Sequence, residues 1–204
     1  ADESLDETEL IKYANSITDY IAVCGLSPSL LVDGQHQLLL SCKTSHTLSP
    51  SEKSMVFDLL KNNMKDSYDA EPQWKWNDAE KSSELFHKNS KFLLYFESEN
   101  PHNLVAFSTF RFEWDDEDEP EHPVLFCYEI QTHSSWQRKS IGRSLMLEVV
   151  KIARELHMWK TMLTCFKKNV LAMKFYERLG FKIDSNSPSS HGHFNEPYEL
   201  LSCK

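Results

Sequence analysis

Residues Trp136–Leu145 read WQRKSIGRSL, and this stretch decides how the fold is interpreted. Three basic side chains, Arg138, Lys139 and Arg143, stand where an apolar run predicted to be a helix from about 140 to 157 begins. Basic residues oppose the helix macrodipole at this end, whereas the backbone N–H groups of a helix start bind anions. Because a buried-looking strand precedes the stretch, we expect a strand–loop–helix junction that holds a phosphate or pyrophosphate. The alternative is a solvated basic loop.

The composition is that of a globular protein. The chain has 204 residues, 40% hydrophobic and 26% charged, which predicts a single domain over 1–204 with an N-terminal helical segment at about 1–25. No apolar run approaches the ~20 residues of a membrane span, so no membrane partner is expected. The five cysteines are scattered and include no CxxC pair, which argues against a disulfide framework and favours a reducing compartment. No metal is expected, and His191 and His193 lie in a Ser/Gly-rich loop.

Local patterns predict alternating helices and strands. Ser49-Pro50-Ser51-Glu52 has the spacing of a capping box, so a helix should follow it. Its inward face is predicted to carry Val56, Leu59, Leu60 and Met64. The other helices are expected over about 4–24, 76–86 (opened by Asn77), 140–157 and 170–179 (ended by Gly180). Strands are expected over 37–43, 91–97, 103–114, 123–131, 161–166 and 198–203, and those from 91 to 131 should form an antiparallel meander.

Two segments carry a family resemblance. Gln137–Gly142 (QRKSIG) resembles the Q/R-x-x-G-x-G/A motif of the GCN5-related acetyltransferase (GNAT) family, and Asn169–Phe181 resembles its second signature. Ser140 stands where the family has its first glycine, and its side chain narrows the approach to a phosphate. The resemblance implies acetyl-CoA as cofactor. It also implies an α/β (mixed α+β) fold, in which a twisted mixed β-sheet has helices on both faces. That sheet splits between its fourth and fifth strands, and the pantetheine arm lies in the split.

The match is closer to one branch of this family. FRFEW, LFCYEIQ, MLTCFKKN, FKIDSNSPS and the late PYELLS resemble the NatD-type N-alpha-acetyltransferases from about residue 50 onward. This resemblance implies acetylation of the N-terminal amine of histone tails beginning Ser-Gly-Arg-Gly, in nucleus and cytoplasm, without an auxiliary subunit. The formal net charge of −9 suits a basic peptide and argues against nucleic acid as a partner. A lysine or polyamine acetyltransferase and a non-catalytic histone-tail binder stay open as alternatives.

The chemistry requires a proton acceptor. A protein α-amino group titrates at about pH 8, so at neutral pH it must lose a proton before it attacks a thioester. A nearby carboxylate accepts that proton directly or through water. We expect Glu129 to be this base and Tyr128 to serve the amine or the thiol, although neighbours on a strand reach one site only where the strand is distorted. A structural role is the alternative for Glu129. Tyr176 competes as the acid on the thiol side, and simple packing is its alternative.

The resemblance also implies binding residues. For the cofactor these are the backbone of Ile130, Gln131 and Thr132, the loop residues Arg138, Lys139, Ser140, Ile141, Gly142 and Arg143, and Thr164 and Asn169. For the peptide they are Tyr68, Trp74, Glu113, Asp115, Tyr128, Asn186 and Tyr198, with Glu113 and Asp115 receiving the substrate arginine. The rest of the acidic segment, 116–121, is expected to be a solvated hairpin loop. Simple structural roles remain open for Thr164, for Asn169 as a helix cap, and for Trp74 and Tyr198 as core aromatics.

Overall fold

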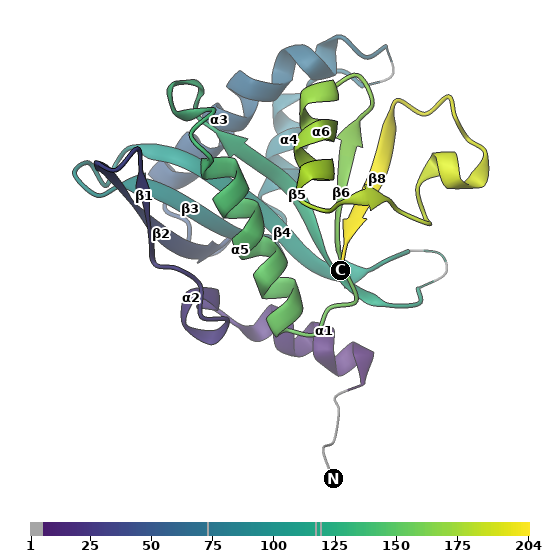
Figure 1. Cartoon of the computed structure of the whole chain (residues 1–204), viewed down its shortest axis with the longest axis horizontal. Helices are drawn as coiled ribbons and strands as arrows, with labels where there is room; N and C mark the ends of the chain where they lie inside the picture. Colours follow the sequence, from purple (N-terminus) through teal and green to yellow (C-terminus); the bar gives the residue numbers. More distant parts are fainter. Residues whose placement is uncertain (1–5, 73, 117, 119) are drawn as a thin grey trace. The chain divides into compact units, whose positions relative to one another are not determined.

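The computed structural model describes residues 6–72, 74–116, 118 and 120–204 (Figure 1). The chain forms two compact units, each built from separate segments. Unit 1 contains Ala1–Ile17, Arg111–Tyr128 and Val149–Lys204, and unit 2 contains Thr18–Phe110 and Glu129–Glu148. The prediction of a single domain stays a prediction, and the units are described one at a time. No helix among the described residues is both long and apolar enough to cross a bilayer.

The strands of unit 2 form an antiparallel meander. They are β1 (Ser29–Val32), β2 (His36–Thr44), β3 (Lys91–Glu97) and the first part of β4 (Leu104–Trp114), paired in that order. The end of β5 (Pro123–Thr132) lies next to β4, and beyond it the His133 backbone N–H donates to the Val105 carbonyl over 2.8 Å. The predicted strands at 37–43, 91–97, 103–114 and 123–131 are confirmed.

Strand β1 was not predicted. It pairs with β2 through a tight turn in which Asp33 and Gly34 have φ of 51° and 73°. Three residues lie between the paired Val32 and His36, and the Gln35 N–H donates to the Val32 carbonyl over 3.2 Å. Two successive positive φ values suit the right-handed twist of a tight hairpin turn, and Asp-Gly is a sequence that adopts them. The local signal was therefore present in LVDGQH.

Helices cover both faces of the unit 2 sheet (Figure 1). On one face lie α3 (Pro50–Asp69), opened by the predicted capping box of Ser49 and Glu52, and α4 (Asp78–Leu85), capped by Asn77. The predicted inward residues of α3 are confirmed. One core contains Val56, Leu59, Leu60 and Met64 of α3 together with Phe92 and Leu94 of β3 and Phe107 of β4. The start of α5 (Ile141–Glu155) lies on the other face, with Ile141, Leu145 and Met146 buried.

The prediction of one helix over about 4–24 is wrong, and its first two residues lie outside the described part. Helix α1 (Glu7–Ser16) ends before Ile17, whose backbone is extended at φ −69° and ψ 132°. A second helix, α2 (Tyr20–Val23), begins after Asp19, whose side chain accepts a hydrogen bond from the Ala22 N–H. The β-branched pair Ile17-Thr18 disfavours the helix and Asp19 offers a new cap, so the chain breaks there.

Unit 1 holds the rest of the sheet, in the order β5-β6-β8-β7 after β4. Strand β6 (Thr161–Phe166) runs parallel to β5, whereas β8 (Tyr198–Cys203) is antiparallel to β6 and to the two-residue β7 (Lys182–Ile183). The ladder between β5 and β6 ends at Cys127–Leu163, although β6 continues to Phe166. These are the fourth and fifth predicted strands, between which the split was expected.

The remaining elements of unit 1 are helical. Helix α6 (Val170–Arg178) begins after its cap Asn169, and Gly180, at φ 90°, follows its end as predicted. The second part of α5 also belongs to this unit. The short 3-10 turns η1 (Ser134–Trp136, in unit 2) and η2 (Pro188–His191) and strand β7 were not predicted. They are too short to produce a periodic pattern.

Candidate active site

Glu129 of β5 has the environment of a general base. The side chain is half-buried, and Gln131 Nε2 donates to its Oε2 over 2.9 Å. Burial raises the pKa of Glu129 to about 7, against the opposing effects of the Gln131 hydrogen bond and the charge of Lys81. A carboxylate that titrates there accepts and returns a proton near neutral pH.

An aromatic cluster with a half-buried lysine is formed by α3, α4 and the segment between them. Tyr68 stacks on Trp74 with ring centroids 6.4 Å apart and meets Trp76 edge-on at 5.7 Å. Lys81 Nζ donates to the Tyr68 hydroxyl over 3.0 Å and lies 4.1 Å from the centroid of its ring. Burial raises the pKa of Tyr68, and the charge of Glu129 raises it further. The predicted peptide-binding pair Tyr68 and Trp74 therefore lies together, within electrostatic range of the candidate base.

The basic loop at residues 136–140 leads into α5. Arg138 and Ser140 have φ of 65° and 62°, in the left-handed region, and the Ser140 carbonyl accepts the first helical bond, from Ser144 N at 3.0 Å. Arg138 and Arg143 are exposed, whereas Lys139 forms an ion pair with Asp33. Two exposed guanidinium groups beside a helix start fit a diphosphate. Ile141 is buried, so only its backbone suits the predicted cofactor contact.

In unit 1, Tyr128 and Glu113 form a hydrogen-bonded pair. The Tyr128 hydroxyl donates to Glu113 Oε2 over 2.7 Å. The guanidinium carbon of Arg111 lies 4.0 Å from the Tyr128 ring centroid, and its Nη1 is 3.8 Å from Glu113 Oε1. Arg111 is buried, but the Glu113 side chain is 32% exposed. One face of this carboxylate therefore remains open to a cationic ligand.

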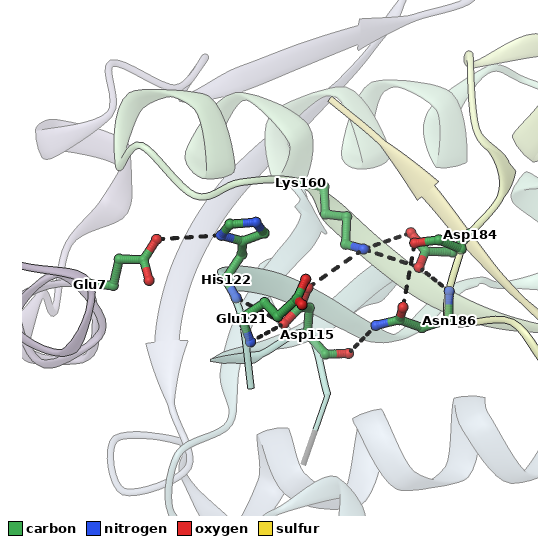
Figure 2. Close-up of polar contacts among 8 residues, drawn as sticks. Glu7, Asp115, Glu121, His122, Lys160, Asp184 and Asn186 are labelled. Atoms are coloured by element: carbon green, nitrogen blue, oxygen red, sulfur yellow. Dashed lines mark hydrogen bonds and ion pairs between the residues drawn. The ribbon is translucent and has the colours of Figure 1, made fainter. Parts of the chain in front are cut away.

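Asp115 belongs to a buried network (Figure 2). Its Oδ1 accepts hydrogen bonds from the backbone N–H groups of Glu121 and His122, and its Oδ2 lies 4.0 Å from Lys160 Nζ. Lys160 also pairs with Asp184 at 2.9 Å, and Asn186 Nδ2 donates to the Asp115 carbonyl over 3.3 Å. Burial opposes ionisation of Asp184, but hydrogen bonds from Lys160, Ser202 and the Asn186 N–H, with the charge of Lys160, together outweigh it and lower the pKa of Asp184. These contacts give Asp115 and Asn186 structural roles, and their predicted substrate roles stay predictions.

The other predicted residues of unit 1 lie on β6, α6 and β8. Thr164 is exposed on β6, opposite Leu200, and half-buried Tyr198 pairs with Phe166. Asn169 caps α6 by accepting from the Ala172 N–H over 3.1 Å. Tyr176 packs edge-on against Phe175 and Phe181 at 5.1 and 5.7 Å. The structure thus shows Asn169 as a helix cap and Tyr176 in aromatic packing, which are their structural alternatives. The cofactor roles of Thr164 and Asn169 stay predictions.

Comparison with known proteins identifies the family. A sequence model of the acetyltransferase (GNAT) family matches residues 54–181. The chain belongs to this family.

Solved structures show the same fold at low identity. The paia N-acetyltransferase of Thermoplasma acidophilum, in complex with coenzyme A, is 15% identical with a TM-score of 0.56, covering 81% of this chain and 98% of that chain. NAA60 of Arabidopsis thaliana, in complex with a bisubstrate analogue, is 12% identical with a TM-score of 0.59, covering 80% and 97%. Naa50 of the same plant, in complex with the bisubstrate analogue CoA-Ac-MVNAL, is 16% identical with a TM-score of 0.52, covering 81% and 98%.

As a GNAT acetyltransferase, the protein transfers an acetyl group from acetyl-CoA. The predicted mixed α/β fold, with a mixed open sheet and helices, is confirmed, and so is the predicted cofactor. Three polar residues that contact predicted site residues within their own units were missed from the sequence: Asn63 and Lys81 in unit 2, and Lys160 in unit 1. Asn63 and Lys81 lie at ordinary helix positions, and Lys160 precedes a strand, so no local pattern distinguishes them.

Proposed function

We propose that this acetyltransferase modifies the N-terminal amine of proteins that begin with Ser-Gly-Arg-Gly, as histone tails do. The observation that carries the proposal is the Glu113 carboxylate, held by the Tyr128 hydroxyl at 2.7 Å and one-third exposed. A carboxylate held in place before binding forms a charge-assisted hydrogen bond with an arginine at little entropic cost. It therefore suits a peptide with arginine near its reacting end.

Glu129 supplies the proton chemistry in this proposal. Acetyl-CoA contributes the acetyl thioester, and the peptide amine must be neutral to attack it. The pKa of Glu129, about 7, lies close to that of an α-amino group at about 8, so proton transfer between them is nearly balanced. We assign the Tyr128 hydroxyl, which donates to Glu113 over 2.7 Å, to the substrate amine or to the departing thiol.

Two further observations support a basic peptide as substrate. The net charge of −9 attracts a cationic chain and repels nucleic acid. The same fold accepts an analogue that joins coenzyme A to MVNAL in Naa50. Because the proposed substrates are histones, we also propose action in nucleus and cytoplasm, and without an auxiliary subunit.

The test uses peptides and one matched pair of variants. We expect product from a Ser-Gly-Arg-Gly peptide and none from the same peptide with a blocked N-terminus. Replacing the peptide arginine by alanine should lower kcat/KM tenfold to hundredfold, because a charge-assisted hydrogen bond is worth roughly 1.5–3 kcal/mol. Glu113→Gln should reproduce that loss without adding to it. Glu121→Gln removes an equal charge from the exposed end of the acidic segment and should change kcat/KM little.

Other outcomes would replace the proposal. Additive losses from Glu113→Gln and the alanine peptide would mean that the arginine does not meet Glu113. Fast acetylation of an internal lysine in the blocked peptide, or of a polyamine, would establish the lysine or polyamine alternative. Peptide binding without any product would indicate a non-catalytic binder.

A further inference from the structure

Two polar side chains of unit 2, Asn63 and Gln131, connect helix α3 to Glu129. Asn63 of α3 donates through Nδ2 to Gln131 Oε1 over 3.0 Å. Gln131 in turn donates through Nε2 to Glu129 Oε2 over 2.9 Å. Gln131 is 8% exposed, so its amide sits in surroundings that water enters little, and the protein must supply its partners.

The network dictates which end of each amide points where. Asn63 Nδ2 also donates to the backbone carbonyl of Thr132 over 3.1 Å. A carbonyl only accepts, so the Asn63 amino group must face it, and the same amino group then faces Gln131 Oε1. Gln131 is thereby oriented with its own amino group toward Glu129.

We propose that Asn63 is a positioning residue for the general base: through Gln131 it presents a donor to Glu129 and favours the ionised, proton-accepting carboxylate. The proposal rests on the proposed role of Glu129 in the reaction. A glutamine oriented by nothing else could instead turn its carbonyl oxygen toward Glu129, and it would then favour the protonated acid.

The donor matters because charged groups of α4 act on Glu129 in opposite directions. Lys81 of α4 favours the charged form, whereas Glu84 of α4 opposes it. Lys81 bonds both Glu84, at 2.8 Å, and the Tyr68 hydroxyl of α3, at 3.0 Å, so its charge is shared. Burial raises the pKa of Glu129 to about 7, and the hydrogen bond from Gln131 is the largest effect that lowers it. Loss of that bond would leave Glu129 mostly protonated at neutral pH.

The experiment is the pH dependence of kcat/KM, from pH 5.5 to 9.5, for matched asparagine variants. Asn63→Ala removes the donor, and Asn63→Asp draws the Gln131 amino group to the new carboxylate. In both, the acidic limb should move to higher pH by about one pH unit, with a roughly tenfold loss at pH 6 and recovery near pH 9. Asn62→Asp adds the same charge at the exposed neighbouring position of α3 and should leave the profile unchanged. The substrate amine is the same throughout, so differences report the enzyme.

A double-mutant cycle separates positioning from simple packing. Gln131→Met should shift the limb as Asn63→Ala does, and the double variant should shift it no further, because Asn63 acts through Gln131. A lowered kcat/KM with an unmoved limb in both Asn63 variants, or additive shifts, would overturn the proposal and leave Asn63 with a packing role.

One further variant distinguishes this failure from failure of the proposed function. Glu129→Gln should abolish the acidic limb along with most of the activity. If that variant keeps near-normal turnover and the wild-type profile, the base lies elsewhere and the proposed role of Glu129 falls. If it is inactive while the Asn63 variants keep the wild-type profile, only the positioning role falls.

Discussion

Lys139 forms an ion pair with Asp33, a residue 106 positions earlier in the chain. Of the three basic residues in WQRKSIGRSL, this one is therefore engaged by the tip of the β1–β2 hairpin, while Arg138 and Arg143 are exposed. The Lys139 side chain is 33% exposed and the Asp33 side chain 45%, so the ion pair contributes at most ~1 kcal/mol to stability. Its consequence concerns which of these three residues would contact the cofactor phosphates.

The two arginines should dominate cofactor affinity. Reversing Arg138 and Arg143 to glutamate should raise the KM for acetyl-CoA at least several-fold, because two charge-assisted contacts to phosphate become repulsive. Lys139→Met should raise it less, since that ammonium already has a carboxylate partner. Initial rates at varied acetyl-CoA and two salt concentrations measure this. An unchanged KM in the double reversal would remove the phosphate assignment.

Ser140→Gly should stabilise the protein and tighten cofactor binding. Ser140 has φ 62°, a conformation that costs a residue with a Cβ about 1–2 kcal/mol and glycine almost nothing. We expect a higher midpoint in urea unfolding and a lower KM for acetyl-CoA. Ser144→Gly, inside α5, should instead destabilise by about 0.5–1 kcal/mol. Equal effects at the two positions would contradict the strain argument.

Glu129→Gln should lower turnover by about 100-fold or more, because the amide has no proton affinity near neutral pH. In the wild-type enzyme, kcat/KM should rise with pH as Glu129 ionises through its pKa of about 7. Peptide binding, measured by calorimetry, should change far less than turnover.

Glu129→Gln should also differ from the wild type in the pH dependence of its stability. The pKa of Glu129 is raised by folding, so the folded state holds its proton more tightly than the unfolded state. The stability that this provides is complete below the unfolded pKa, at about 4.5, and is lost as pH rises to about 7. Relative to Glu129→Gln, the wild type should therefore lose stability across this window and change little above it. A difference independent of pH would show that the pKa is not raised.

Lys160→Met should strongly destabilise unit 1. Lys160 is 7% exposed and lies between the carboxylates of Asp115 and Asp184, so its loss leaves two buried negative charges together (Figure 2). Removing one partner of such a group costs about 3–5 kcal/mol. Lys182→Met, at an exposed position of β7, should stay within about 0.5 kcal/mol of the wild type in the same unfolding titration.

Local signals account for most of the secondary structure. The capping box at Ser49, the cap at Asn77 and the glycine after α6 each act within a few residues, so the boundaries of α3, α4 and α6 follow from the chain itself. The break at Ile17 was missed because apolar spacing continues through it, and helical periodicity outweighed the competing cap at Asp19.

The sequence by itself determined most of the strands and helices, the basic loop before α5 and the two signatures of the family, because each depends on residues close together in the chain. Only the tertiary structure decided which side chains act on one another. Asn63 forms a hydrogen bond with Gln131, which lies 68 positions later in the chain, and Asp33 pairs with Lys139, which lies 106 positions later. Such pairs arise when packed elements bring distant residues within hydrogen-bond range, and burial then alters the protonation of groups like Glu129. No periodicity or motif encodes that proximity, since it depends on how the helices and strands pack.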